Sequence, residues 1–125
     1  MNDPAWPTDL KLKDGGHTLA VHFDDGAVFD LAAEYLRVES PSAEVKGHGP
    51  GQEVTVAGKR QVRILTLQPV GNYAVRIGFD DGHNSGLYTW DYLMRLGREH
   101  GTLWRDYLAR LAAKGLSRDS AIPGH

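Results

Sequence analysis

The sequence contains no cysteine. This absence excludes disulfide bonds, thiolate metal sites, cysteine nucleophiles and cysteine-ligated iron–sulfur clusters. No apolar run approaches the roughly 20 residues that cross a bilayer, and the first residues lack the charged-then-apolar pattern of a signal peptide. The net charge is -2 and no dense cluster of Lys and Arg is present, which argues against nucleic-acid binding. We therefore expect a cytoplasmic protein that binds neither nucleic acid nor a membrane.

Sequence motifs of the common catalytic classes are also missing. There is no Gly-x-Ser-x-Gly nucleophile motif. The glycine-rich segment Lys46–Gly51 is followed by strand-like residues, whereas a phosphate-binding loop leads into a helix. The 6 histidines include no pair at i, i+4 spacing that would place two metal ligands on one helical face. We expect no enzymatic activity and no resident cofactor.

What the sequence does contain is an internal repeat. Leu19–Gly26 is an alternating apolar run that ends Asp-Asp-Gly, and Ala74–Gly82 follows the same pattern. Each copy continues with a short return strand and with a helix that begins with an acidic residue beside Tyr-Leu, at Glu34 and at Asp91. The repeat predicts two related β-hairpin–helix units. The expected fold class is α+β, with a small, mostly antiparallel sheet and a C-terminal helical segment.

Local signals define the expected elements within this frame. Asp30 is expected to cap a helix over 31–36, and Thr89 a helix that begins at Trp90. Helical spacing then continues, as two helices or one kinked helix, to Gly115, which is expected as the C′ residue. The segment 39–51 is expected to be a loop. We expect one domain over 10–115, with flexible ends at 1–9 and 116–125.

The paired aspartates and His83 are the first candidate functional residues. Adjacent carboxylates on a strand point to opposite faces, and both pairs directly precede a turn glycine, so the turn interpretation is favoured over acid–base catalysis. His83 lies in the second hairpin loop, where the first copy has Ala27. Its residue type suits either a local hydrogen bond or a binding role, and both interpretations stay open.

The run Pro69–Leu93, with its Asp-Gly-His-x-Ser-Gly-x-Tyr-x-Trp-x-Tyr-Leu motif, closely resembles the gamma-butyrobetaine hydroxylase-like N-terminal domain. The similarity extends from about Thr8 to Leu96. Members of this family are small free-standing bacterial proteins, N-terminal domains of gamma-butyrobetaine and trimethyllysine dioxygenases, or domains fused to iron–sulfur carrier proteins. The dioxygenases carry their iron and 2-oxoglutarate site in another domain, so the resemblance implies a non-catalytic domain.

The resemblance also implies where a zinc ion would lie. The dioxygenases hold a structural zinc through three cysteines and one histidine of this domain. Here Ser40, Ser42 and Val45 occupy the cysteine positions, and only His83 matches a ligand. Neutral hydroxyls are poor zinc ligands, so we expect no metal at this site.

Two functional hypotheses follow. The first is a non-catalytic accessory or protein-interaction module with an unidentified protein partner and an undetermined oligomeric state. The binding surface expected for it is formed by the 82–88 loop and the residues that follow, namely His83, Asn84, Ser85, Tyr88, Trp90 and Tyr92. The second is a metal-binding or iron–sulfur-assembly accessory protein, in which Glu39, Glu44 or His48 joins His83. Such ligands suit iron or manganese better than zinc.

Overall fold

The computed structural model describes residues 5–46 and 54–119 and contains two three-stranded antiparallel sheets. The first sheet is formed by β1 (Pro7–Lys13), β2 (Thr18–Phe23) and β3 (Val28–Ala32), with a short 3-10 turn, η1 (Asp14–Gly16), between β1 and β2. The second is formed by β4 (Ile64–Val70), β5 (Ala74–Phe79) and β6 (Leu87–Thr89). The helices are α1 (Ala33–Val38), α2 (Ala43–Lys46), α3 (Trp90–Arg98) and α4 (His100–Ala113). The α+β class is confirmed, although the expected single sheet is divided into two.

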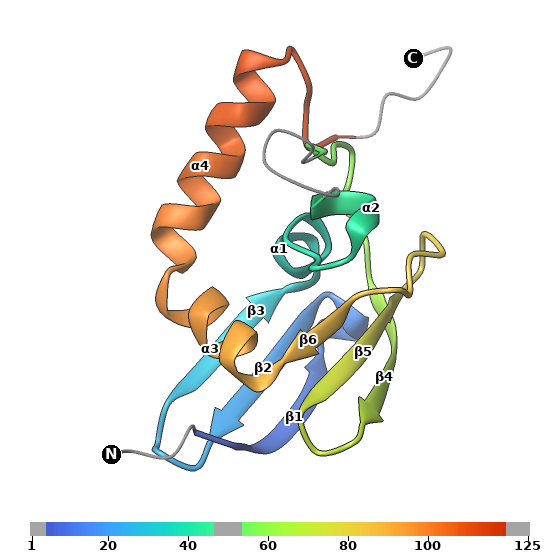
Figure 1. Cartoon of the computed structure of the whole chain (residues 1–125). Coiled ribbons are helices and arrows are strands. Elements are labelled where there is room, and N and C mark those ends of the chain that lie inside the picture. Colours follow the sequence, from blue (N-terminus) through green and yellow to red (C-terminus); the bar gives the residue numbers. More distant parts are fainter. Residues whose placement is uncertain (1–4, 47–53, 120–125) are drawn as a thin grey trace.

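The two predicted repeat units are visible as β1-β2-β3-α1 and β4-β5-β6-α3. In Figure 1 the strands fill one half of the molecule, α1, α2 and α4 lie in the other, and α3 lies beside β3 and β6. The inward residues of the central strands β2 and β5 occupy equivalent positions in the two copies and join one core cluster: Leu19, Val21 and Phe23 in the first, Val75, Ile77 and Phe79 in the second. A shared core therefore joins the two sheets.

The repeated Tyr-Leu motif has a structural role that its recurrence alone does not reveal. The Tyr35 hydroxyl donates to the Leu96 carbonyl at 2.6 Å, and the Tyr92 hydroxyl donates to the Glu39 carbonyl. Leu96 lies four residues after Tyr92, and Glu39 lies four residues after Tyr35. The tyrosine hydroxyl of each repeat thus donates a hydrogen bond to a carbonyl at the C-terminal end of the other repeat's helix.

The prediction that Asp30 caps the first helix is wrong. β3 continues to Ala32, Asp30 is paired with Ala20 of β2, and its carboxylate accepts a hydrogen bond from Lys13 Nζ at 3.1 Å. Further pairing with β2 buries Leu31, so the strand extends past the residue that resembled a cap. α1 then begins after Ala32 without a side-chain cap.

The later helix boundaries follow the predictions more closely. The Thr89 side chain accepts a hydrogen bond from the Tyr92 amide, and Gly115 has φ 65° just after α4, which confirms both expected caps. The helical segment is two helices that meet at Glu99. Within the expected loop 39–51, residues 43–46 form α2, and 47–51 lie outside the described residues.

Residues outside the expected domain limits of 10–115 also make contacts with the rest of the described structure. Residues 7–9 belong to β1, and the Gly58 amide donates to the Ser117 carbonyl at 2.9 Å. The Arg118 guanidinium donates twice to the buried Glu34 carboxylate, at 2.8 and 2.7 Å. These contacts attach the segment after α4 to α1. No helix in the described parts of the chain is long and apolar enough to cross a membrane.

Candidate functional site

The two Asp-Asp-Gly turns have the same hydrogen-bond pattern. Asp24 Oδ1 accepts from the Trp6 amide at 3.1 Å, and Asp80 Oδ1 accepts from the Arg63 amide at 3.1 Å. The second aspartates, Asp25 and Asp81, each accept from the amide two residues later at 3.0 Å. Each pair therefore joins a turn to the neighbouring chain segment and closes the turn itself. This confirms the turn interpretation of the aspartates.

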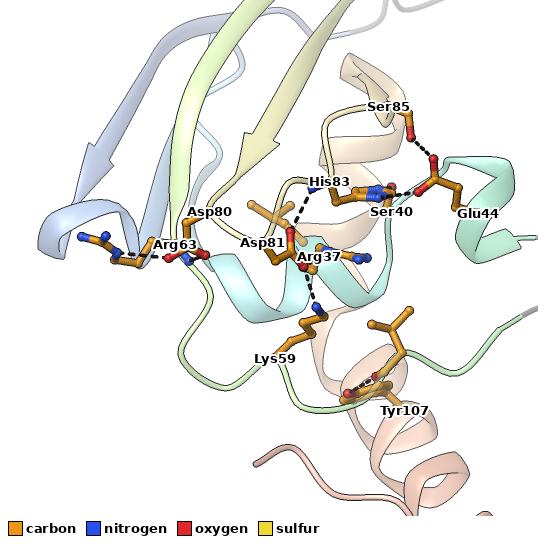
Figure 2. Close-up of polar contacts among 12 residues, drawn as sticks. Arg37, Ser40, Glu44, Lys59, Arg63, Asp80, Asp81, His83, Ser85 and Tyr107 are labelled. Carbon is orange, nitrogen blue, oxygen red and sulfur yellow. Dashed lines mark hydrogen bonds and ion pairs between the residues drawn. The ribbon is translucent and has the colours of Figure 1, made fainter. Parts of the chain in front are cut away.

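Asp81 has a further role that Asp25 lacks. Its carboxylate accepts from Arg37 Nε at 2.8 Å and lies 2.6 Å from Lys59 Nζ (Figure 2). Partial burial opposes ionisation, but hydrogen bonds from Lys59, the His83 amide and Arg37 outweigh it and lower the pKa of Asp81 from 3.8 to about 2. The second turn is therefore attached to α1 and to the chain before β4.

His83 is buried and lies at the centre of a hydrogen-bond network that reaches the surface at Glu44 and Ser85 (Figure 2). Its Nδ1 is 3.0 Å from the Glu44 carboxylate, which can only accept, so Nδ1 carries the proton. Nε2 lies 2.9 Å from the Ser40 hydroxyl and accepts from it when the ring carries only the Nδ1 proton. Ser85 Oγ donates to Glu44 at 3.2 Å and lies 2.8 Å from Ser42 Oγ. The network joins the β5–β6 loop to the connection between α1 and α2, which gives His83 the hydrogen-bonding role considered for it.

The order Ser40–His83–Glu44 matches the arrangement of a catalytic triad, but its serine is inaccessible. Ser40 has no exposed surface. A Cβ atom added at Gly86 would lie 2.6 Å from Ser40 Oγ, which shows how closely the loop backbone covers the hydroxyl. A nucleophile has to reach its substrate, so this serine cannot attack one in the described conformation.

The six residues predicted to form one binding surface differ in burial and in position. His83 and Tyr88 are buried, and the Tyr88 hydroxyl donates to the Leu36 carbonyl at 2.5 Å. Asn84 and Ser85 are exposed on the loop at one end of β6, whereas Trp90 begins α3 at the other end. Tyr92 faces α1. Of the six, His83 and Tyr88 therefore lie beneath the surface, whereas Asn84 and Ser85 are exposed on it.

Trp90 instead borders a groove that includes two aromatic residues not considered from the sequence. The groove has a volume of about 510 Å³ and is lined by Trp6, Tyr73 and Trp90 together with Asn72, Thr89 and Asp91. Trp6 and Tyr73 are 44% and 52% exposed. We call this region the aromatic groove. The sequence signal that could have identified it is a tryptophan between Ala5 and Pro7, in a segment expected to be flexible.

The family relationship follows from these features and from comparison with known proteins. Residues 10–94 match the model of the family described as gamma-butyrobetaine hydroxylase-like, N-terminal. The chain belongs to this family. No curated protein matches it.

Three solved structures resemble this member of the gamma-butyrobetaine hydroxylase-like N-terminal family. Two are NMR solution structures, 44% and 48% identical, with TM-scores of 0.81 and 0.80. Each covers 98% of this chain, and they are covered over 98% and 95% of their own length. The third is the crystal structure of a DUF971-family protein of unknown function from Acidithiobacillus ferrooxidans. It is 37% identical with a TM-score of 0.63, over 77% of this chain and 98% of that one.

The residues at the zinc-ligand positions that the family resemblance implies do not suit a zinc ion. Ser40 and His83 are in contact, and the Ser42 amide donates to Ser40 Oγ at 3.3 Å, so three of the four ligand positions do converge. Two of them offer neutral hydroxyls, and Val45 at the fourth is a buried aliphatic side chain. Among the described residues, no three His, Asp or Glu side chains are grouped to hold a metal ion.

The other ligands considered for a metal are not gathered at His83 either. Glu44 reaches His83, but Glu39 pairs with Lys46 Nζ at 3.1 Å. His48 lies outside the described residues.

Proposed function

We propose that this protein is a non-catalytic accessory module that binds a protein partner through the aromatic groove. The observation that carries the proposal is the exposure of Trp6 and Tyr73 around a pocket of about 510 Å³. Large aromatic side chains are costly to leave in water and dominate the binding energy of protein interfaces. Contact with an apolar side chain of a partner would remove this surface from water.

Hydrogen bonds hold the groove in shape, which favours binding. The indole Nε1 of Trp90 donates to the Asn72 carbonyl at 2.8 Å. Trp6 is held from the other side, since its carbonyl accepts from the Asp24 amide at 2.8 Å. A preformed groove loses less conformational entropy on association than a flexible segment would.

The charge of the groove indicates the chemistry of the partner. Asp91 is exposed at its edge, and none of the residues that line the groove is cationic. A partner segment that presents an apolar side chain beside a Lys or Arg would match both properties. We propose the aromatic groove in place of the binding surface expected from the sequence. Trp90 belongs to both.

Capture experiments with matched variants test the proposal. Wild-type protein, Trp6→Ala and Leu65→Ala are immobilised and exposed to lysate, and the affinity of each retained protein is then measured with purified components. Leu65 is 58% exposed on β4 and is not among the groove-lining residues, so it controls for loss of exposed apolar surface. We expect a partner that wild type and Leu65→Ala retain and that Trp6→Ala binds about tenfold more weakly or worse. Equal affinity for all three proteins would contradict the proposal.

A metal-handling role has no comparable support. Both ring nitrogens of His83 already have partners in Ser40 and Glu44.

A further inference from the structure

A second pocket, which we call the basic pocket, lies among the four α-helices and differs from the aromatic groove in charge. Its volume is about 490 Å³, within the range of small-molecule sites. Its lining includes three cationic residues, Lys46 of α2, Arg95 of α3 and Arg110 of α4. Glu39, which follows α1, is the only carboxylate among the described residues that line the pocket. Sequence analysis placed Tyr92 on a binding surface, and the structure places it in this pocket.

Exposure decides which charge a ligand would meet. The side chains of Lys46, Arg95 and Arg110 are 40%, 55% and 45% exposed. The Glu39 side chain is 6% exposed. The cationic groups therefore stand at the surface of the pocket, while its carboxylate is covered. An anion entering the pocket would meet the cations first.

The described carboxylates leave part of this positive charge unmatched. Glu39 lies 3.1 Å from Lys46 Nζ but 3.8 Å from the nearest Arg110 nitrogen, which is beyond hydrogen-bond length. Glu99 accepts from Arg95 Nε at 3.4 Å, in a half-exposed pair of the kind that contributes little. Guanidinium groups bind carboxylates and phosphates through paired N–H donors, and both arginines keep such donors available.

The remaining lining is apolar. Val38 and Val45 are buried in the pocket wall, and Leu103 of α4 is partly buried beside them. The Tyr92 hydroxyl already donates its proton to the Glu39 carbonyl, so this proton is not available to an anionic ligand. A ligand that matches this lining has an apolar body and one anionic end.

We infer that the basic pocket binds a small amphipathic oxyanion, a carboxylate or phosphate attached to an aliphatic body. The anionic end would lie against Arg95 and Arg110, and the aliphatic part against Val38, Val45 and Leu103. This site is separate from the aromatic groove and does not depend on the proposed protein partner. Leu103 and Arg110 lie on α4, beyond the residues 10–94 that match the family model.

Titration with matched amphiphiles tests the inference on the full chain. Octanoate and octyl phosphate are compared with octylammonium at equal ionic strength, and amide chemical shifts of isotope-labelled protein report the site and the Kd. We expect one or both anions to shift amides of α2, α3 and α4 around the pocket, with octylammonium producing no comparable change. The stronger of the two anions identifies the head group.

Variants then test the arginines. Arg95→Gln with Arg110→Gln should weaken anion binding by about tenfold or more, because each neutral amide loses a charge-assisted contact. Arg105→Gln removes the same charge from an exposed position of α4 that does not line the pocket, and should leave Kd unchanged within about twofold.

Three results would overturn the inference: equal binding of octylammonium, equal weakening by Arg105→Gln, or shifts confined to the aromatic groove. If the double variant loses its dispersed spectrum, the single Arg110→Gln variant and the wild-type comparison of anion with cation decide the question.

Discussion

Asp81→Asn offers the sharpest test of how the second turn is held, because the internal repeat supplies its own control. The amide oxygen of asparagine can still accept from the His83 amide, so the turn itself is kept. The variant loses the negative charge that Arg37 and Lys59 contact at 2.8 and 2.6 Å. Nη1 of Arg37 is already buried without a hydrogen-bond partner in the described structure, so its guanidinium would be left poorly compensated.

The magnitude follows from the pKa of Asp81. Lowering this pKa from 3.8 to about 2 corresponds to about 2.5 kcal/mol of folding free energy. The carboxylate is 18% exposed, so solvent screening reduces the expected contribution to about 1–2 kcal/mol. Because the folded-state pKa is depressed, this contribution is fully present above about pH 4 and is lost as the pH falls toward 2.

Urea denaturation of wild type, Asp81→Asn and Asp25→Asn measures the effect. Asp25 makes the same turn hydrogen bond, but its cationic contact is Arg98 at 3.7 Å, with both side chains well exposed. At pH 7 we expect Asp81→Asn to lower the free energy of unfolding by about 1–2 kcal/mol, and Asp25→Asn by less than about 0.5 kcal/mol. The deficit of Asp81→Asn should shrink between pH 4 and pH 3. Equal losses in the two variants, or a deficit that does not change with pH, would refute the reasoning.

Two further predictions concern the covered serine and the absent metal. Gly86→Ala should lower the free energy of unfolding by about 1–3 kcal/mol, because its Cβ would lie 2.6 Å from Ser40 Oγ. Gly101→Ala in α4 meets no atom within 4 Å and should raise the free energy of unfolding by about 0.5–1 kcal/mol. Thermal denaturation distinguishes the two variants, and similar melting temperatures would show that the contact at Gly86 is not tight. The triple variant Ser40→Cys, Ser42→Cys, Val45→Cys should bind one zinc ion and gain thermal stability on zinc addition, while wild type should contain well under one equivalent of zinc or iron by elemental analysis. Near-stoichiometric metal in the wild type would restore the metal-handling hypothesis.

Much of the architecture was predictable because its signals are local. β2, Thr18–Phe23, coincides with the apolar part of the alternating run that begins at Leu19, and Thr89 caps α3 as its position suggested. The Asp-Asp-Gly turns were interpreted correctly, since the aspartate–amide contact that closes each turn spans only two residues. The α+β class followed from the number and order of such elements.

The errors arose where a distant partner changed a local preference. Asp30 has the chemistry of a helix cap, but pairing with β2 holds it in a strand. Residues outside the expected limits 10–115 also have distant partners. Arg118 is held by Glu34, and Trp6 by Asp24, and neither pair can be recognised from the neighbouring sequence.

The candidate sites show the same division. His83 was identified as unusual by comparing the two copies, yet its partners Ser40 and Glu44 are separated from it by 43 and 39 positions. Trp90 was named as a surface residue, but Trp6 and Tyr73, which complete the groove, come from the residue before β1 and from the turn between β4 and β5. Neither pocket could be derived from spacing, because no motif links its residues.

Composition, alternation and turn chemistry act over a few residues, and they were enough to define the repeat, the class of fold and the absence of thiol chemistry in this protein. Packing of the two repeats against each other determined the rest. His83 and Tyr88 became buried, and Tyr35 and Tyr92 each donate to a carbonyl of the other repeat. Arg110 of α4 lies close to the buried carboxylate of Glu39, which follows α1. The physical reason is that burial and charge pairing depend on which segments meet in space, and the free energy that selects this arrangement comes from the shared core of both copies.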